Sequence, residues 1–147
     1  MSYWRIVGGY LGRAIRIAEI SAFERLPPDQ LLDSVMLVFF GNNFEPDENG
    51  LAFLESLVQQ QPLAITVCGS GARKAFDSLI SQLSDGKIRE HTMTKLFEAN
   101  DFELAIEDLL QATWPSEDRF DEWKSYSILS VGNVTARIEQ AAKKFCD

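Results

Sequence analysis

Two unbroken apolar runs decide the fold of this chain, SVMLVFF at positions 34–40 and LAITVC at positions 63–68. The first is followed by GNN and the second by GSG, and both tripeptides are turn signals. A strand that is apolar at every position is typical of a sheet covered on both faces. Amphipathic patterns follow both runs, and Ala72 to Leu83 keeps the helical spacing of apolar residues throughout. This stretch therefore predicts a βαβα unit with parallel strands.

The rest of the chain adds elements on both sides of this unit. Residues 92–97 and 125–131 are rich in β-forming side chains and predict two further strands. We expect helices after each of them, the first capped by Asn100 with Glu103 three positions later. Residues 1–26 predict a hairpin or an edge strand, with Gly8-Gly9 as its turn.

These elements predict one α/β domain over residues 1–147. We expect a three-layer α/β/α sandwich of Rossmann-like or flavodoxin-like type, with a mostly parallel sheet of four to five strands. In such a fold a ligand binds at the carboxyl ends of the strands.

Composition narrows the class of protein. The chain has 147 residues, of which 46% are apolar and 24% charged, as in an ordinary globular domain. Its two cysteines are far apart and form no disulfide framework, which favours a reducing cytoplasm. No segment has the length of apolar sequence that a membrane span needs, and the presence of a single histidine, His91, disfavours a zinc site of the usual type. We expect no metal and no cofactor.

The negative charge is concentrated in one segment. Residues 98–122 hold nine of the 22 acidic residues and only one of the 14 basic residues, so they carry the whole net charge of −8. This charge disfavours nucleic acid and anionic membranes as partners and favours a basic protein. The other interpretation is a solvated helix face and loop. Phe120 and Trp123 are candidate hot spots of a partner-binding surface, or they anchor the loop on the core. The predicted partner-binding residues are Asp101, Glu103, Glu107, Asp108, Glu117, Asp118, Phe120, Asp121, Glu122 and Trp123.

The glycine turn after the second apolar run carries the other candidate site. A cysteine at a strand end, next to free N–H groups at a helix start, can have a lowered pKa and act as a nucleophile. The same backbone can bind an anion without catalysis. The alternative is a small buried strand residue followed by an ordinary turn. The candidate catalytic residues are Cys68 and Arg73, and the candidate anion-binding residues are Gly69, Ser70, Gly71, Arg73 and Lys74.

Two resemblances accompany these motifs. Cys68, Gly71 and Arg73 are spaced as in the active loop of rhodanese-like sulfurtransferases, although the acid-x-arginine and glycine-rich segments of those domains are absent. The loop resembles that of cysteine phosphatases less closely, because Lys74 stands where those enzymes have arginine. It also departs from the dinucleotide fingerprint, whose third glycine would fall at Lys74.

From about residue 27 to 133 the chain resembles an uncharacterised bacterial family of small α/β domains. The likeness rests on an early Leu-Pro, the strand ending in Val-Cys-Gly69, the strand starting at His91-Thr-Met-Thr and the acidic helix with Glu103. The family implies a Rossmann-like architecture and a bacterial cytoplasmic protein, and it brings no activity or site residues.

The leading hypothesis is a non-enzymatic binding protein whose acidic face meets a basic partner, by analogy with small acidic proteins of immunity or antitoxin type. The alternative is an enzyme of sulfurtransferase or phosphatase type that uses Cys68, or an anion- or nucleotide-binding domain at the glycine turn. The sequence leaves the oligomeric state open.

Overall fold

A computed structural model describes residues 4–27, 31–84, 92–98, 101–132 and 134–146 of the chain. It contains one sheet of six strands, so the predicted number of four to five is too low. The strands are β1 (Arg5–Tyr10), β2 (Arg13–Ile20), β3 (Ser34–Phe40), β4 (Ala64–Gly69), β5 (Met93–Phe97) and β6 (Ser125–Val131). Their order in the sheet is β1-β2-β6-β3-β4-β5, and only β1 is antiparallel to its neighbour. The sheet is therefore mostly parallel, as predicted.

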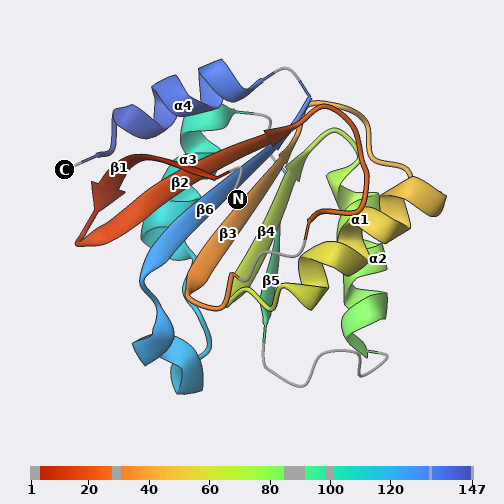
Figure 1. Ribbon diagram of the computed structural model, residues 1–147, viewed down its shortest axis with the longest axis horizontal. Helices are drawn as coiled ribbons and strands as arrows, with labels where there is room; N and C mark the ends of the chain where they lie inside the picture. Colours follow the sequence, from red (N-terminus) through yellow and green to blue (C-terminus); the bar gives the residue numbers. More distant parts are fainter. Residues whose placement is uncertain (1–3, 28–30, 85–91, 99–100, 133, 147) are drawn as a thin grey trace.

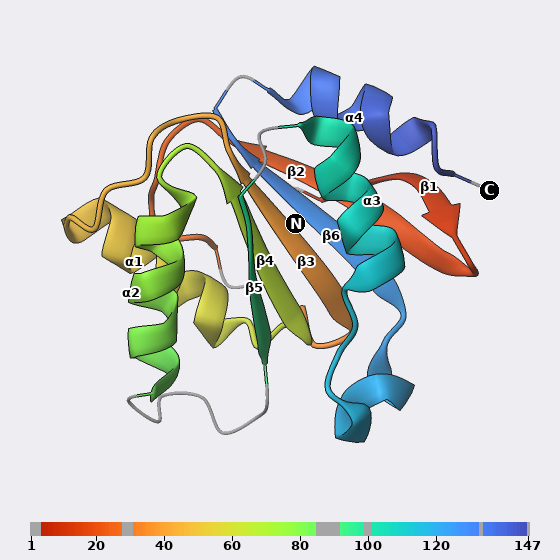
Figure 2. The same cartoon turned by 180° about the vertical axis from the view of Figure 1, so that it is seen from behind.

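Helices cover both faces of this sheet (Figures 1 and 2). One pair, α1 and α2, lies on one face, and the other pair, α3 and α4, lies on the opposite face. A short 3-10 helix, η1, connects α3 to β6. The helices are α1 (Glu48–Gln59), α2 (Ala72–Ser84), α3 (Phe102–Ala112), η1 (Glu117–Glu122) and α4 (Thr135–Lys143). The predicted three layers of an α/β fold are present, and the arrangement is consistent with a Rossmann-like fold.

The apolar run of β3 is explained by burial on both sides. Met36, Val38 and Phe40 belong to the core under α1 and α2. Val35, Leu37 and Phe39 belong to the core under α3 and α4. All seven residues of this strand are buried, because it lies between two parallel neighbours and two helical layers.

The amino-terminal segment forms an antiparallel hairpin that extends the sheet. The predicted turn at Gly8-Gly9 is wrong, since both glycines lie inside β1 and the chain turns at Leu11-Gly12. Both turn residues have positive φ, 50° and 80°, which fits a two-residue hairpin loop. Gly8 instead leaves space for Cys146, because a Cβ at this position would overlap the Cys146 Sγ atom.

The start of α3 also differs from the prediction by one residue. Asp101 is the N-cap, and its carboxylate accepts a hydrogen bond from the Leu104 N–H at 3.0 Å. The predicted cap, Asn100, lies outside the described residues. The predicted polar loop before β6 is in part the helix η1.

Two glycines with similar values of φ provide a test of how tightly the turn between β4 and α2 packs against Phe44. Gly71 has φ +77°, and a Cβ there would lie 2.6 Å from the backbone N and O of Phe44. Gly12 has φ +80° with nothing within 4 Å of the same position. We expect Gly12→Ala to lower the free energy of unfolding by about 1–2 kcal/mol, the cost of the left-handed conformation. Gly71→Ala should cost a further ~1–3 kcal/mol because the backbone must move.

Urea denaturation of the two variants and the wild type measures this difference. Equal losses for both variants would contradict the tight contact between the glycine turn and Phe44.

Candidate functional site

The predicted anion-binding turn lies between β4 and α2, at the carboxyl edge of the sheet. The Ser70 N–H donates to the Phe40 carbonyl and the Phe44 N–H donates to the Ser70 carbonyl, each at 3.0 Å. The Ser70 hydroxyl donates to Oδ1 of Asn43 at 3.0 Å. Gly69, with φ +101°, has no room for a side chain because a Cβ would overlap the Phe40 carbonyl. The turn is therefore fixed against the loop that follows β3.

An open crevice of about 590 Å³ lies beside this turn, and its lining includes Asn43, Gly69, Gly71, Arg73, Lys74, Phe97 and Glu98. Both predicted cations line it, but each already has an acidic partner. Arg73 pairs with Glu98, and the Lys74 ammonium donates to both carboxylate oxygens of Glu45 at 2.9 and 3.1 Å. The hydrogen bond from Lys74 lowers the pKa of Glu45. An anion in this crevice would have to displace these carboxylates.

Hydrogen bonds join the chain at the point where the strand order reverses, between β3 and β6. The Gly41 N–H donates to the Val131 carbonyl at 2.7 Å across the two strand ends. The Asn42 side chain donates to the Ser21 carbonyl at 2.9 Å and lies against Gly132. The crevice described above lies beside β4 and β5, whereas parallel folds commonly bind ligands at the reversal point.

Cys68 lies below this turn and is fully buried. Its side chain belongs to the core under α3 and α4, whereas the neighbouring Val67 faces α2. The thiol thus points away from the helix whose start would lower its pKa. Burial, and secondarily the negative charge of Asp108, raise the pKa of Cys68 to about 12. This environment keeps the thiol protonated at neutral pH, which is the opposite of what the nucleophile hypothesis requires.

Alkylation of the cysteines tests this description. In a Cys146→Ser background, we expect iodoacetamide to modify Cys68 at neutral pH far more slowly in the folded protein than in denaturant, because the native thiol is buried and protonated. Raising the pH should deprotonate Cys68 in the unfolded chain near pH 8.5 but not in the folded one. Stability should therefore fall above that pH, and Cys68→Ala should remove this part of the fall. Rapid modification of folded Cys68 near pH 7 would contradict the assigned environment and favour the nucleophile hypothesis.

The acidic residues of α3 are largely engaged within the protein. Asp101 caps the helix and Glu103 pairs with Lys144 of α4. Asp108 accepts a hydrogen bond from the Lys95 ammonium at 2.7 Å. Glu107 is exposed. The first turn of α3 also borders a hollow of about 480 Å³ lined by the basic residues Arg137 and Lys144. The two lysines therefore offset the negative charge of Glu103 and Asp108 along α3.

The acidic segment does not form one continuous face. Figure 2 shows that α3 begins beside α4 and that η1 lies at the far end of α3, near the amino ends of the parallel strands. We call the residues Trp114, Glu117, Asp118, Phe120, Asp121 and Glu122 the η1 surface, because all six are exposed on η1 or just before it.

The η1 surface combines carboxylates with two exposed aromatic rings. Trp114 is 57% exposed and Phe120 is 45% exposed. The only base of η1, Arg119, is 3% exposed. Its guanidinium lies 3.5 Å from the Glu122 carboxylate and donates to the Gln61 carbonyl at 3.5 Å. The positive charge is thus turned inward and the carboxylates outward.

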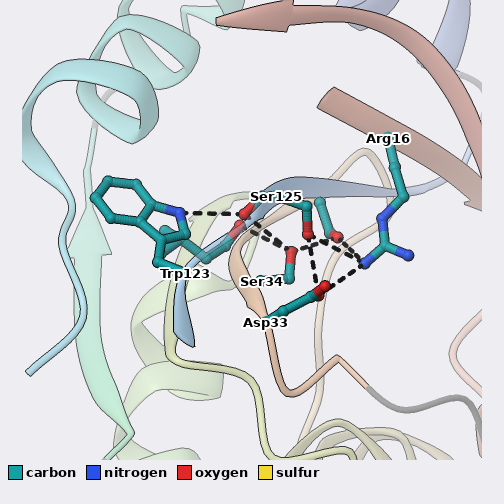
Figure 3. Close-up of polar contacts among 7 residues, drawn as sticks. Arg16, Asp33, Ser34, Trp123 and Ser125 are labelled. Carbon is teal, nitrogen blue, oxygen red and sulfur yellow. Dashed lines mark hydrogen bonds and ion pairs between the residues drawn. The ribbon is translucent and has the colours of Figure 1, made fainter. Parts of the chain in front are cut away.

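Trp123 follows η1 and is buried, so of the two predicted aromatic anchors it alone serves that role. Figure 3 shows its indole N–H directed at the Ser125 carbonyl, at 3.2 Å. The Ser34 hydroxyl lies 3.4 Å from the same carbonyl. A polar network continues from here across three strands, through a 2.6 Å contact of Ser34 with Ser127 and a 3.1 Å bond from Arg16 to Ser127. The end of η1 is thereby fixed to the sheet.

Arg13 also fixes the end of η1, through contacts with Trp123 that the sequence did not predict. Its guanidinium carbon lies 3.7 Å from the centre of the Trp123 ring and 6.0 Å from that of Phe120. Its Nε–H donates to the Trp123 carbonyl at 3.3 Å. Tyr126 and Tyr10 extend the aromatic cluster through edge contacts. The guanidinium of Arg13 thus links the β1-β2 hairpin to the aromatic residues at the end of η1.

No family model, curated protein or solved structure matches this chain. The resemblances drawn from the sequence therefore stay predictions. In the part of the chain that the structure describes, no helix is long and apolar enough to cross a bilayer. Within the same ranges no group of three or more His, Cys, Asp or Glu side chains is arranged to hold a metal ion. His91 lies outside these ranges.

Proposed function

We propose that this protein is a non-enzymatic binding protein that uses the η1 surface to hold a basic protein partner. The observation that carries the proposal is the exposure of Trp114 and Phe120 among four exposed carboxylates. Large aromatic side chains supply most of the binding energy in many interfaces, and surrounding charges steer the partner and reject wrong ones. A role of immunity or antitoxin type in a bacterial cytoplasm is the functional class we propose, by analogy alone.

The η1 surface is held in place by buried residues, and this supports its choice as the binding surface. Trp123 and Arg119 are buried at either end of the Phe120 turn, and the polar network of Figure 3 joins Trp123 to three strands. A surface held in one shape loses less conformational entropy when a partner binds. The acids of α3 contribute less to the proposal, because Glu103 and Asp108 are paired with lysines of the same chain.

Charge reversal tests the proposal. We expect Glu117→Lys with Asp121→Lys to weaken partner binding by at least about tenfold, because like charges at an interface cost several kcal/mol. Neither side chain forms an ion pair with another described residue, so the fold should be kept. The matched control is Glu24→Lys with Asp77→Lys, which changes net charge equally at exposed positions elsewhere.

The measurement has two steps. The immobilised wild type captures a partner from cell lysate, and the affinity of the purified partner is then measured for each variant at low and high salt. Equal losses in the η1 and control variants would mean that only net charge matters, and would refute the proposed surface.

We propose anion binding at the crevice beside β4 and β5 as the second candidate function. The supporting observation is that Arg73 and Lys74 both line this open space at the start of α2. Because Glu98 and Glu45 occupy these cations, Glu98→Gln with Glu45→Gln should strengthen the binding of inorganic phosphate, and Arg73→Ala should weaken it. Chemical shifts of the Gly71 to Lys74 amides during a phosphate titration report the affinity. Unchanged shifts in the double Gln variant would exclude this site.

A further inference from the structure

The aromatic cluster beside η1 already holds one guanidinium, that of Arg13. The planar group lies over the Trp123 ring, with 3.7 Å between the guanidinium carbon and the ring centre, and also donates to the Trp123 carbonyl. Arginine stacks on aromatic rings because its guanidinium is planar, delocalised and weakly hydrated. The contact shows that an aromatic ring at the end of η1 can hold a guanidinium group.

Phe120 offers a further aromatic surface next to this contact. Its ring meets Trp123 edge to face, with 5.5 Å between ring centres and 85° between planes, and 45% of the residue remains exposed. Asp121 and Glu122 follow it directly, and Glu117 lies one turn earlier, where side chains of a 3-10 helix stand one above the other. An exposed ring is thus flanked along η1 by carboxylates, which are acceptors that suit a guanidinium.

Resting on the proposed function, we propose that the basic partner presents an arginine to this surface and that the η1 surface selects arginine over lysine. The guanidinium of the partner lies against the exposed part of the Phe120 ring, and its N–H groups donate to the carboxylates of Glu117 and Asp121. Arginine can satisfy both contacts at once, because its donors lie in the plane of the group and leave its faces free for the ring. The ammonium group of lysine is a compact, strongly hydrated charge, which gains from the carboxylates and less from the ring.

Two synthetic peptides of equal length and equal charge test this selectivity. One alternates glycine with arginine and the other alternates glycine with lysine, and isothermal titration calorimetry measures the Kd of each at two salt concentrations. We expect the wild type to bind the arginine peptide about twofold to fivefold more tightly than the lysine peptide, the effect of one exposed cation–π contact.

Variants of Phe120 assign the preference to its ring. Phe120→Leu keeps an apolar side chain but removes the ring, so the two peptides should bind equally while the Kd of the lysine peptide changes little. Phe120→Trp restores a ring and should keep or increase the preference, because tryptophan is the strongest cation–π partner. Near-ultraviolet circular dichroism checks that the environment of the aromatic cluster is kept in both variants.

The outcomes separate the two proposals. Salt-sensitive binding of both peptides by the wild type with equal affinity would overturn arginine selectivity and leave the acidic binding surface intact. A preference for arginine that persists in Phe120→Leu would also overturn the inference, since the carboxylates alone would then explain it. Binding of neither peptide would overturn the proposed function together with the inference.

Discussion

The structure depends on the burial of β3 on both faces and along both edges. Its backbone groups pair with β4 on one side and β6 on the other, and its side chains alternate between two helical layers. A strand so enclosed has no access to water. The neighbouring strands must therefore supply its backbone hydrogen bonds, and the helical layers must cover its apolar side chains. This pairing also places the glycine turn and η1, because the turn follows β4, η1 precedes β6, and both strands pair with β3.

Local features of the fold could be predicted from the sequence, and pairings between distant segments could not. The strand at 34–40 and the helix after Gly71 were readable because their patterns repeat within a few residues. The insertion of β6 beside β3 was not, because the contact between Ser34 and Ser127 joins residues 93 positions apart. The hairpin turn was misplaced because Gly8, which looks like a turn residue, is required by the packing of Cys146.

The candidate site was predictable in composition but not in arrangement. The acidic run did not indicate that Lys144 and Lys95 pair with Glu103 and Asp108, because both lysines lie outside it. Alternation along β4 could not tell which face Cys68 would occupy, since both faces of that strand are buried and apolar. Arg13 lay in a segment with an ordinary alternating pattern, so its position against Trp123 depended on tertiary contacts alone.

The order of the strands has a consequence for how the chain is made. The parallel partner of β2 is β6, which pairs with it from Ala14 opposite Ser125 to Ile20 opposite Val131. On a ribosome, β2 emerges before β3, β4 and β5, and β6 emerges after all of them. The nascent hairpin therefore presents an open edge until β6 has emerged, and such edges pair readily with other chains. Completion of the sheet, and with it the attachment of Arg13 to η1, becomes possible only after the other five strands have been made.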